Sequence, residues 1–170
     1  MAVAAGDLKW LLSGASGNSD PNASLGGGES ASEVVFSPTM NNLFDNVDPA
    51  EASSGATEYR CIYLQNDHAT DTIIGVKVWI NSQTPSSSSS IEIGLDPVGK
   101  NGTATGPISP SSSAPAGVSF SAPSSQGSGL AVGTLNAQDT YAVWIKRVIS
   151  ALAPAAANDP FTLSVSGTPS

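Results

Sequence analysis

The stretch that decides the fold class is Glu58-Tyr59-Arg60-Cys61-Ile62-Tyr63-Leu64-Gln65. In an extended chain Tyr59, Cys61 and Tyr63 fall on one face, and Ile62 and Leu64 fall on the other. This alternation of large apolar side chains is typical of a β-strand. Residues 72–80 repeat the pattern, and the polar residues 66–71 between the two runs favour a turn. We therefore expect residues 58–80 to form an antiparallel hairpin.

The same alternation recurs along the rest of the chain, whereas helical periodicity is almost absent. Strong strands are expected at residues 140–149 and 161–165. Weaker candidates are residues 8–12, 33–36, 91–95, 117–120 and 129–132. Clusters of Gly, Pro and Ser separate these runs, which favours two packed antiparallel sheets. The predicted fold is an all-β, antiparallel β-sandwich with immunoglobulin-like or jelly-roll-like connections.

Two segments rich in Ser, Gly, Asn or Pro show no periodicity. Residues 13–32 cannot bury enough apolar surface to order themselves alone, which predicts an extended arm that orders against another molecule. Residues 99–128 are longer than most loops of a compact domain, and loops of that length commonly serve a function. We therefore divide the chain into an N-terminal segment with a flexible arm, residues 1–32, and one sandwich domain, residues 33–170. The apolar side chains that we expect to face a partner are Trp10, Leu12, Leu25, Val34 and Phe36.

The composition indicates a surface suited to contact with other proteins. Charged residues make up 12% of the chain, about half of the roughly 25% found in an average soluble domain. The surface must consist largely of Ser, Thr, Asn, Gly and Ala, which lose little hydration energy on contact. A net charge of −8 and a pI near 4.2 disfavour binding to nucleic acid, since affinity for phosphates comes from clustered Lys and Arg.

Cysteine content and targeting signals limit the class of protein further. The single cysteine excludes an intrachain disulfide, and Cys61 lies within an apolar run, which indicates a core residue. No apolar stretch approaches the roughly 20 residues of a membrane-spanning helix. The first residues lack the basic start and apolar run of a secretory signal. We expect a soluble protein that is made in a cytoplasm and has no membrane partner.

The residues that catalysis requires are scarce. The single histidine, His68, falls in the predicted turn, where capping the loop is the favoured role. No serine lies in a Gly-x-Ser-x-Gly elbow. The carboxylates close enough in sequence to form a catalytic pair are Glu92 with Asp96, and Asp45 with Asp48 and Glu51. Turn formation or a solvated face is the favoured interpretation of these groups, so we predict that the protein is not an enzyme and binds no cofactor.

Two ligand-binding alternatives stay open at this point. Residues 45–48 and 18–20 alternate oxygen-bearing side chains, as calcium ligands do, but neither has the full spacing of a calcium loop. Local hydrogen bonding is the favoured interpretation, and no metal site is predicted. Trp10, Trp79 and Trp144 could form a platform for a sugar, although the strand patterns around Trp79 and Trp144 favour a place in the core.

Several segments carry a likeness to a known family. They are residues 57–66, 68–70 and 76–80, and then residues 93–96, 100–102, 141–147 and 158–163. Residues 10–26 share the likeness. Together these segments resemble a family of virion structural proteins of tailed bacteriophages. The shared motifs are structural rather than chemical, so the resemblance implies a virion context more directly than one station in the particle.

Within that family the resemblance implies a capsid decoration protein, also called a cement protein. Such a protein binds the outer shell and stabilises it by bridging neighbouring capsid subunits. The implied partners are the major capsid protein and copies of the chain itself, in a homotrimer. The implied location is the capsid surface of the virion, after synthesis in the bacterial host cytoplasm. Two alternatives remain: a neck, tail or baseplate component, and a carbohydrate-binding β-sandwich module on the virion.

Overall fold

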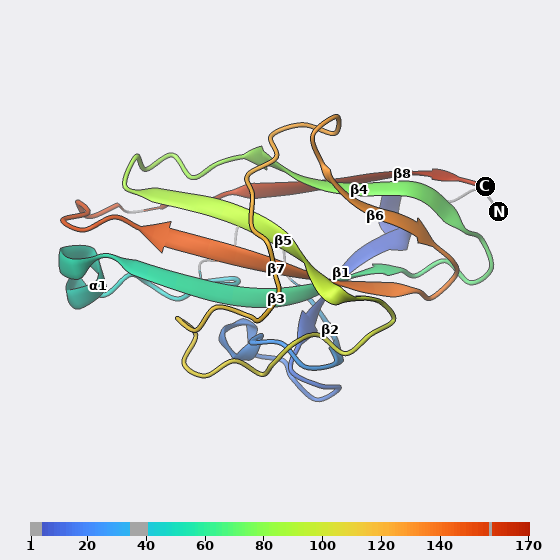
Figure 1. Ribbon diagram of the computed structural model, residues 1–170, viewed down its shortest axis with the longest axis horizontal. Helices are drawn as coiled ribbons and strands as arrows, with labels where there is room; N and C mark the ends of the chain where they lie inside the picture. The colour runs from blue at the N-terminus through green and yellow to red at the C-terminus, as the bar shows by residue number, and fades with distance from the viewer. Residues whose placement is uncertain (1–4, 35–40, 157) are drawn as a thin grey trace.

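The computed structural model describes residues 5–34, 41–156 and 158–170, which form two antiparallel sheets (Figure 1). The larger sheet has five strands in the order β2-β1-β3-β7-β5, and the smaller sheet has three in the order β6-β4-β8. The strands are β1 (Leu8–Ser13), β2 (Glu29–Glu33), β3 (Ala56–Asn66), β4 (Ile73–Ser82), β5 (Ser89–Lys100), β6 (Leu130–Leu135), β7 (Thr140–Ile149) and β8 (Thr162–Pro169). The short helix α1 (Pro49–Ser54) and two 3-10 turns, η1 (Ala5–Asp7) and η2 (Pro21–Ala23), complete the elements. The predicted all-β sandwich is confirmed.

The main hydrophobic core lies between the two sheets. On the larger sheet it contains Ile62 and Leu64 of β3 and Val143 and Ile145 of β7. The smaller sheet contributes Ile73, Val76, Val78 and Ile80 of β4. Each of these side chains is at most 2% exposed. Because full burial of such a side chain stabilises a protein by about 1.5–3 kcal/mol, this core holds the two sheets together.

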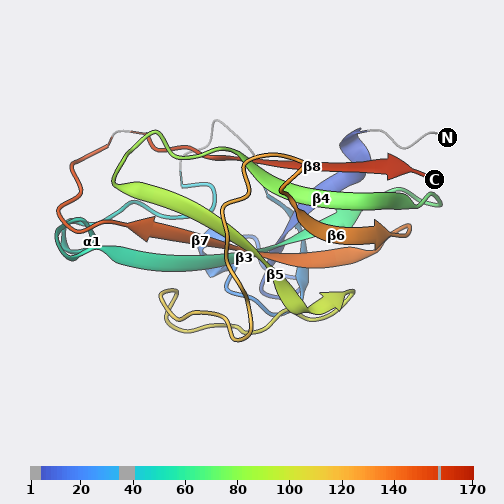
Figure 2. The same ribbon diagram turned by 45° about the horizontal axis from the view of Figure 1, so that its top comes forward.

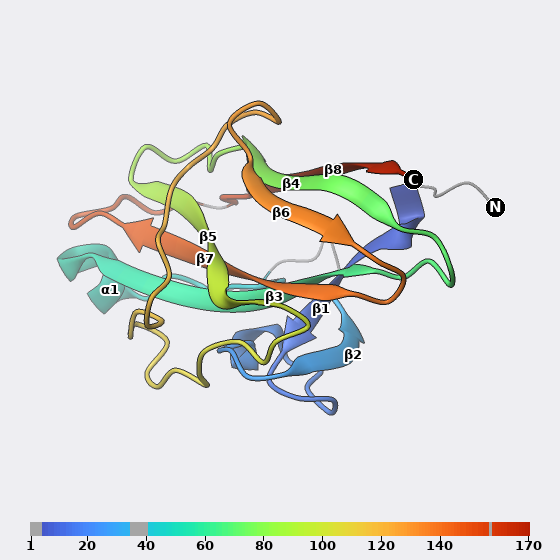
Figure 3. The same cartoon turned by 45° about the vertical axis from the view of Figure 1, so that its right-hand side comes forward.

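The opposite face of the larger sheet is also buried, by loops instead of strands. Cys61 and Tyr63 of β3 and Trp144 of β7 lie on this face, and each is 0% exposed. Residues 14–28 and 101–121, which we call the loop layer, cover them with Leu25, Ala104, Ile108, Val118 and Phe120. Figures 2 and 3 show these loops beneath the larger sheet, on the side away from the smaller one. The molecule therefore has three layers.

The predicted hairpin of residues 58–80 is wrong. β3 pairs with β1 and β7 in the larger sheet, whereas β4 pairs with β6 and β8 in the smaller one. The polar residues 67–72 therefore lead from one sheet to the other. Alternation shows which face of a strand is buried, but it does not identify the strand beside it.

A second correction concerns the faces of β4. The alternation places Ile74 on the buried face together with Val76 and Val78, but the structure exposes Ile74 to 44% and buries Ile73 to 1%. Gly75, which follows Ile74, has φ +64, and the pairing of β4 shifts register between Ile73 and Val76. This irregularity exchanges the faces of the residues before it, as a β-bulge does.

Most of the other strand predictions agree with the structure. Residues 140–149 form β7, and residues 8–12, 91–95 and 161–165 correspond to β1, β5 and β8. Residues 129–132 overlap the beginning of β6. Residues 117–120 form no strand and precede a single bridge between Ile93 and Ser121. Of residues 33–36, Glu33 ends β2, while residues 35 and 36 lie outside the described residues.

Residues 13–32 do not extend away from the sandwich as an arm. β1 is an inner strand and β2 pairs with it, so the predicted boundary between residues 32 and 33 falls inside β2. The intervening loop is closed at its base, where the amides of Gly14 and Ala15 donate to the Gly28 carbonyl at 3.0 and 2.9 Å. A Cβ at Gly26 would lie 3.0 Å from the ring of Trp144, so the loop passes directly over that indole. The segment packs on its own sheet because this contact removes the apolar face around Trp144 from water.

Candidate interaction surface

The side chains predicted to face a partner lie mostly inside the molecule. Trp10, Leu12 and Val34 belong to the core between the sheets, with exposures of 8%, 2% and 6%. Leu25 belongs to the loop layer and is half-buried against the cluster that contains Tyr63 and Trp144. Phe36 lies outside the described residues. An interface role for these five residues stays a prediction, and the first three stabilise the core of the single chain.

Buried polar groups fix the loop layer to the larger sheet. The carboxylate of Asp96, 0% exposed, accepts hydrogen bonds from Nε1 of Trp144 at 2.8 Å and from the amide of Thr105 at 2.9 Å. The Tyr63 hydroxyl donates to the Gly27 carbonyl at 2.6 Å and accepts from the Ala104 amide at 2.8 Å. Burial raises the pKa of Tyr63 to about 12, so this hydroxyl keeps its proton. The inner side of the loop layer is therefore occupied by the sheet.

Five of the six Lys and Arg side chains form ion pairs within the chain. The pairs are Lys9 with Glu33 and Asp67, Lys100 with Asp139, Lys146 with Glu92, and Arg60 and Arg147 with Glu58 and Asp45. The sixth cation, Lys77, donates to the Gly127 carbonyl at 3.5 Å. Since the acidic groups outnumber the cations by 14 to 6, the surplus charge of the surface is negative.

Two arginines enclose Phe44 at one end of the sandwich. The guanidinium carbons of Arg60 and Arg147 lie 5.1 and 4.7 Å from the ring centroid, within the range of a cation–π contact. Arg147 binds Glu58, and Nε of Arg60 donates to the Leu43 carbonyl at 3.1 Å. Burial lowers the pKa of Arg60, while the nearby carboxylate of Glu58 opposes that change. The cluster ties the segment before α1 to β3 and β7.

His68 caps the loop between β3 and β4, as predicted. Its Nδ1 accepts hydrogen bonds from the amides of Thr70 at 3.2 Å and Asp71 at 2.9 Å. Its Nε2 lies 3.7 Å from Oδ2 of Asp71. Because two backbone amides use the Nδ1 lone pair, that nitrogen is not free to take a proton from a substrate.

The core interpretation of Cys61 is confirmed. Its side chain is 0% exposed and lies beneath the loop layer. Burial raises the pKa of its thiol well above the ordinary value, and the nearby charge of Asp96 acts in the same direction. A nucleophilic thiolate is therefore disfavoured at neutral pH.

Each carboxylate considered as a member of a catalytic pair has a structural partner. Glu92 binds Nζ of Lys146 at 2.8 Å on the surface, whereas Asp96 is buried. Asp48 and Glu51 form a capping box at the start of α1, with reciprocal hydrogen bonds of 2.8 Å. Asp45 lies beside Arg60 and Arg147. Each group has a structural role in the described residues.

Local hydrogen bonding also accounts for residues 18–20. Oδ1 of Asp20 accepts from the amide of Asn22, and Oδ1 of Asn18 accepts from the amide of Asp20, each at 2.9 Å. In residues 5–34, 41–156 and 158–170, no group of three or more His, Cys, Asp or Glu side chains is placed to hold a metal ion. The hydrogen-bonded interpretation of this loop is the one that the geometry fits.

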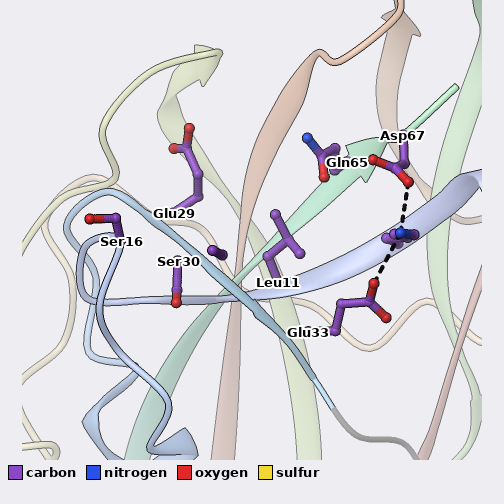
Figure 4. A pocket seen from close by; sticks show the side chains of 9 residues that line it. Leu11, Ser16, Glu29, Ser30, Glu33, Gln65 and Asp67 are labelled. Carbon is purple, nitrogen blue, oxygen red and sulfur yellow. Dashed lines mark ion pairs between the residues drawn. The ribbon is translucent and has the colours of Figure 1, made fainter. Parts of the chain in front are cut away.

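An open depression of about 390 Å³ lies over β1 and β2 (Figure 4). Nζ of Lys9 lies 3.0 Å from the carboxylate of Glu33 and 2.7 Å from that of Asp67. Hydrogen bonds to Asp67 and then Glu33 raise the pKa of Lys9, so its amine remains protonated and is a poor nucleophile. Glu29 and Gln65 also line the depression, which is polar and shallow. It resembles a solvated surface more than a catalytic pocket.

The outer face of the smaller sheet is nearly free of charge. We call it the small-sheet face, formed by Ile74, Lys77 and Trp79 of β4, Ala131 of β6, and Ser164 and Ser166 of β8. Lys77 is the one charged residue in β4, β6 and β8. Trp79 is half-buried beside Ser164, and Ile74 is 44% exposed. Sequence reasoning missed this face, although the absence of charge from β6 and β8 was a signal for it.

The described helices offer no segment that is long and apolar enough to span a membrane. Among the described residues, the small-sheet face is the candidate interaction surface that we consider further. No protein-family model, curated protein or solved structure matches this chain.

Proposed function

We propose that the chain is a structural protein of a tailed-bacteriophage virion, a capsid decoration protein that binds the outer shell and bridges neighbouring capsid subunits. The observation that carries this proposal is the small-sheet face, where Trp79 and Ile74 lie on a surface with the single charge of Lys77. Trp is enriched at the energetic centres of protein interfaces. The Ser164 hydroxyl beside Trp79 can supply a hydrogen bond at a low desolvation cost, while Oγ of Ser166 already accepts one from Nε2 of Gln126 at 2.9 Å.

The charge distribution supports an outer position in the particle. Five of the six Lys and Arg side chains form ion pairs within the chain. The net charge of −8 therefore comes from Asp and Glu side chains in excess of these cations. Such a surface repels phosphate and does not suit contact with packaged DNA. The outside of the shell imposes no such penalty, and this difference favours a decoration role over an internal one.

Stabilisation would follow from selective binding. A protein that binds the assembled shell and not its separated subunits shifts the equilibrium toward the shell by mass action. Several weak footprints on one oligomer add through avidity. The proposed partners are accordingly the major capsid protein and other copies of this chain.

The test uses particles that lack the protein, to which purified protein is added back. The measurements are the number of copies bound and the thermal or osmotic stability of the shell. Ile74→Asp places a charge on the small-sheet face, and we expect it to abolish binding. Leu152→Asp is the matched control, because Leu152 is 84% exposed in the turn after β7, and we expect binding to persist. Failure of the unmodified protein to bind intact shells would remove the decoration role.

Two alternative stations make different predictions in the same experiment. A neck, tail or baseplate component would bind isolated tails and leave shells bare. A carbohydrate-binding module would need exposed aromatic side chains, and the structure buries Trp10 to 8% and Trp144 to 0% while leaving Trp79 half-buried. Sugar binding that is lost in Trp79→Ala, without shell binding, would favour that module.

A further inference from the structure

The two sheets end in four edge strands, β2, β5, β6 and β8. An edge strand presents unpaired backbone N–H and C=O groups to which another strand can bind, and proteins normally block such edges. The four edges of this chain differ in how they are blocked.

The chain blocks β5 with its own polar groups. The Gln83 side chain imitates a strand beside Ile91, since its Nε2 donates to the Ile91 carbonyl at 2.7 Å and its Oε1 accepts from the Ile91 amide at 2.9 Å. Two residues further on, Ile93 and Ser121 exchange backbone hydrogen bonds of 2.8 and 3.0 Å. Pro97 then interrupts the donors of the strand. A new strand could pair here only by displacing these groups.

Charge and irregular backbone protect two further edges. β2 has five residues and begins and ends with a glutamate, Glu29 and Glu33. β6 contains Gly133 with φ +94, where its register with β4 shifts. Charged residues and bulges are both common means of preventing pairing at an edge.

The central part of β8 lacks these protections: residues 162–168 contain no proline, Pro169 stands at the end of the strand, and at both register shifts with β4 the extra residue lies on β4. It contains no charged residue, and within the described ranges it pairs with β4 alone (Figure 2). The Ile80 amide donates to the Pro123 carbonyl at 2.8 Å and so points away from β8. Leu163, opposite Ile80, is therefore at a non-hydrogen-bonded position of the ladder. It follows that Leu163 and Val165 direct their N–H and C=O groups toward the open edge.

The sequence of β8 is nearly symmetric about Val165. It reads Thr162-Leu163-Ser164-Val165-Ser166-Gly167-Thr168. An antiparallel pair of two such strands, centred on Val165, places Ser164 opposite Ser166 and Thr162 opposite Thr168. Hydroxyl pairs of this kind stabilise antiparallel strands, and no like charges meet although each chain carries −8.

We infer that β8 pairs with β8 of a second copy of this chain around a twofold axis, and so joins the two smaller sheets into one continuous sheet. The outward groups of Leu163, Val165 and Gly167 in one copy meet those of Gly167, Val165 and Leu163 in the other, which allows about six backbone hydrogen bonds. A twofold contact makes a dimer, whereas the resemblance to cement proteins implies a trimer. The inference concerns copies of this chain only and does not depend on binding to a capsid.

The first experiment measures mass in solution against concentration, by analytical ultracentrifugation of the full chain. Val165→Pro removes an outward N–H that the β4 ladder does not use, and we expect the dimer to dissociate at least about tenfold more readily. The matched control is Ala131→Pro. Ala131 lies opposite Lys77, whose backbone N–H and C=O point toward β8, so the Ala131 amide points to the outer edge of β6, at the other side of the same sheet. We expect this variant to remain dimeric.

The second experiment tests the register and does not rely on a folded proline variant. In the proposed pair, Ser164 of one copy lies opposite Ser166 of the other at about 4.5 Å between Cα atoms, a distance that a disulfide can span. Equivalent Ser164 residues are diagonal neighbours about 7–8 Å apart. Under mild oxidation, a mixture of Ser164→Cys and Ser166→Cys chains should form the mixed disulfide, and each variant alone should form little. Cys61, 0% exposed, does not compete.

Three results would overturn the inference: an unmodified chain that is monomeric or trimeric at every concentration, a dimer that Val165→Pro leaves intact, or cross-linking that is equal in the mixture and the single variants. If Val165→Pro does not fold, the cross-linking experiment decides. Because no capsid is present in either experiment, failure here leaves the proposed shell binding to be judged by its own test.

Discussion

Asp96→Ala removes the acceptor that joins the loop layer to the larger sheet. The Asp96 carboxylate accepts hydrogen bonds from Nε1 of Trp144 at 2.8 Å and from the amides of Thr105 and Val98 at 2.9 Å each. Trp144 is 0% exposed, whereas Val98 is 47% exposed. After the substitution, water can reach the Val98 amide, but the Trp144 indole N–H would be buried without a partner.

The expected loss follows from counting the donors that are left unsatisfied. A buried donor without a partner costs about 1–3 kcal/mol. With the Trp144 indole fully buried and the Thr105 amide half-buried, we expect the free energy of unfolding to fall by about 3 kcal/mol. For a chain of this length, that loss corresponds to a decrease in Tm of about 6–12 °C.

The assay is urea unfolding followed by circular dichroism and tryptophan fluorescence. Glu92→Gln is the matched control, because Glu92 lies on the same strand and forms an ion pair with Lys146 in which the two side chains are 34% and 24% exposed. Exposed pairs contribute less than about 1 kcal/mol. A loss for Asp96→Ala that is no larger than that for Glu92→Gln would refute the account of Asp96 as the anchor of the loop layer.

Three further outcomes are expected. Cys61 should resist a thiol reagent in the folded protein and react once the chain is unfolded in denaturant, because burial raises the pKa of its thiol; a fast reaction under native conditions would contradict its placement. Gly26→Ala should lower the free energy of unfolding by more than about 2 kcal/mol, because φ is +97 and the added Cβ would overlap a carbonyl oxygen. The control Gly17→Ala, at an exposed position, should change it by less than about 0.5 kcal/mol. Equal effects of the two substitutions in urea unfolding would argue against this packing. Burial alone would raise the pKa of Asp139, but hydrogen bonds, first that from Asn101, outweigh burial and lower it. The stability that Asp139 contributes is therefore present above its unfolded pKa of about 3.9 and is lost as the pH falls through the folded pKa. Asp139→Asn should accordingly show a smaller acid-induced decrease in Tm than the unmodified chain.

Alternation along the chain was sufficient to predict the strands but not their neighbours. Residues 140–149 show the alternation throughout and form β7 with those bounds. The same signal in residues 58–80 could not show that β3 and β4 belong to different sheets, since pairing depends on distant strands. One clue was present: β3 is apolar on both faces, and a strand of a two-layer sandwich needs only one such face. The second apolar face of β3 is the one that the loop layer covers.

Composition was a weaker guide to the loops and to the candidate surface. Residues 13–32 contain too little apolar surface to fold alone, but Trp144 and Tyr63 supply that surface from other strands. The small-sheet face depends on the bulge at Gly75, which turns Ile74 outward, and a period of two cannot anticipate the change. Long-range packing therefore decided the features that the local pattern left open.

The irregular backbone of β6 at Gly133, at the other edge of the smaller sheet, and the blocking of β5 by Gln83 and Ser121 together limit how large an assembly can become. A fibril grows only when each subunit has two edge strands that can pair with other subunits. A subunit with one such edge strand stops at the dimer. A protein that must stay dispersed at high concentration until it is needed benefits from this arrangement. Loss of the Gln83 amide, as in Gln83→Ala, would then be a step toward unlimited stacking rather than a local defect.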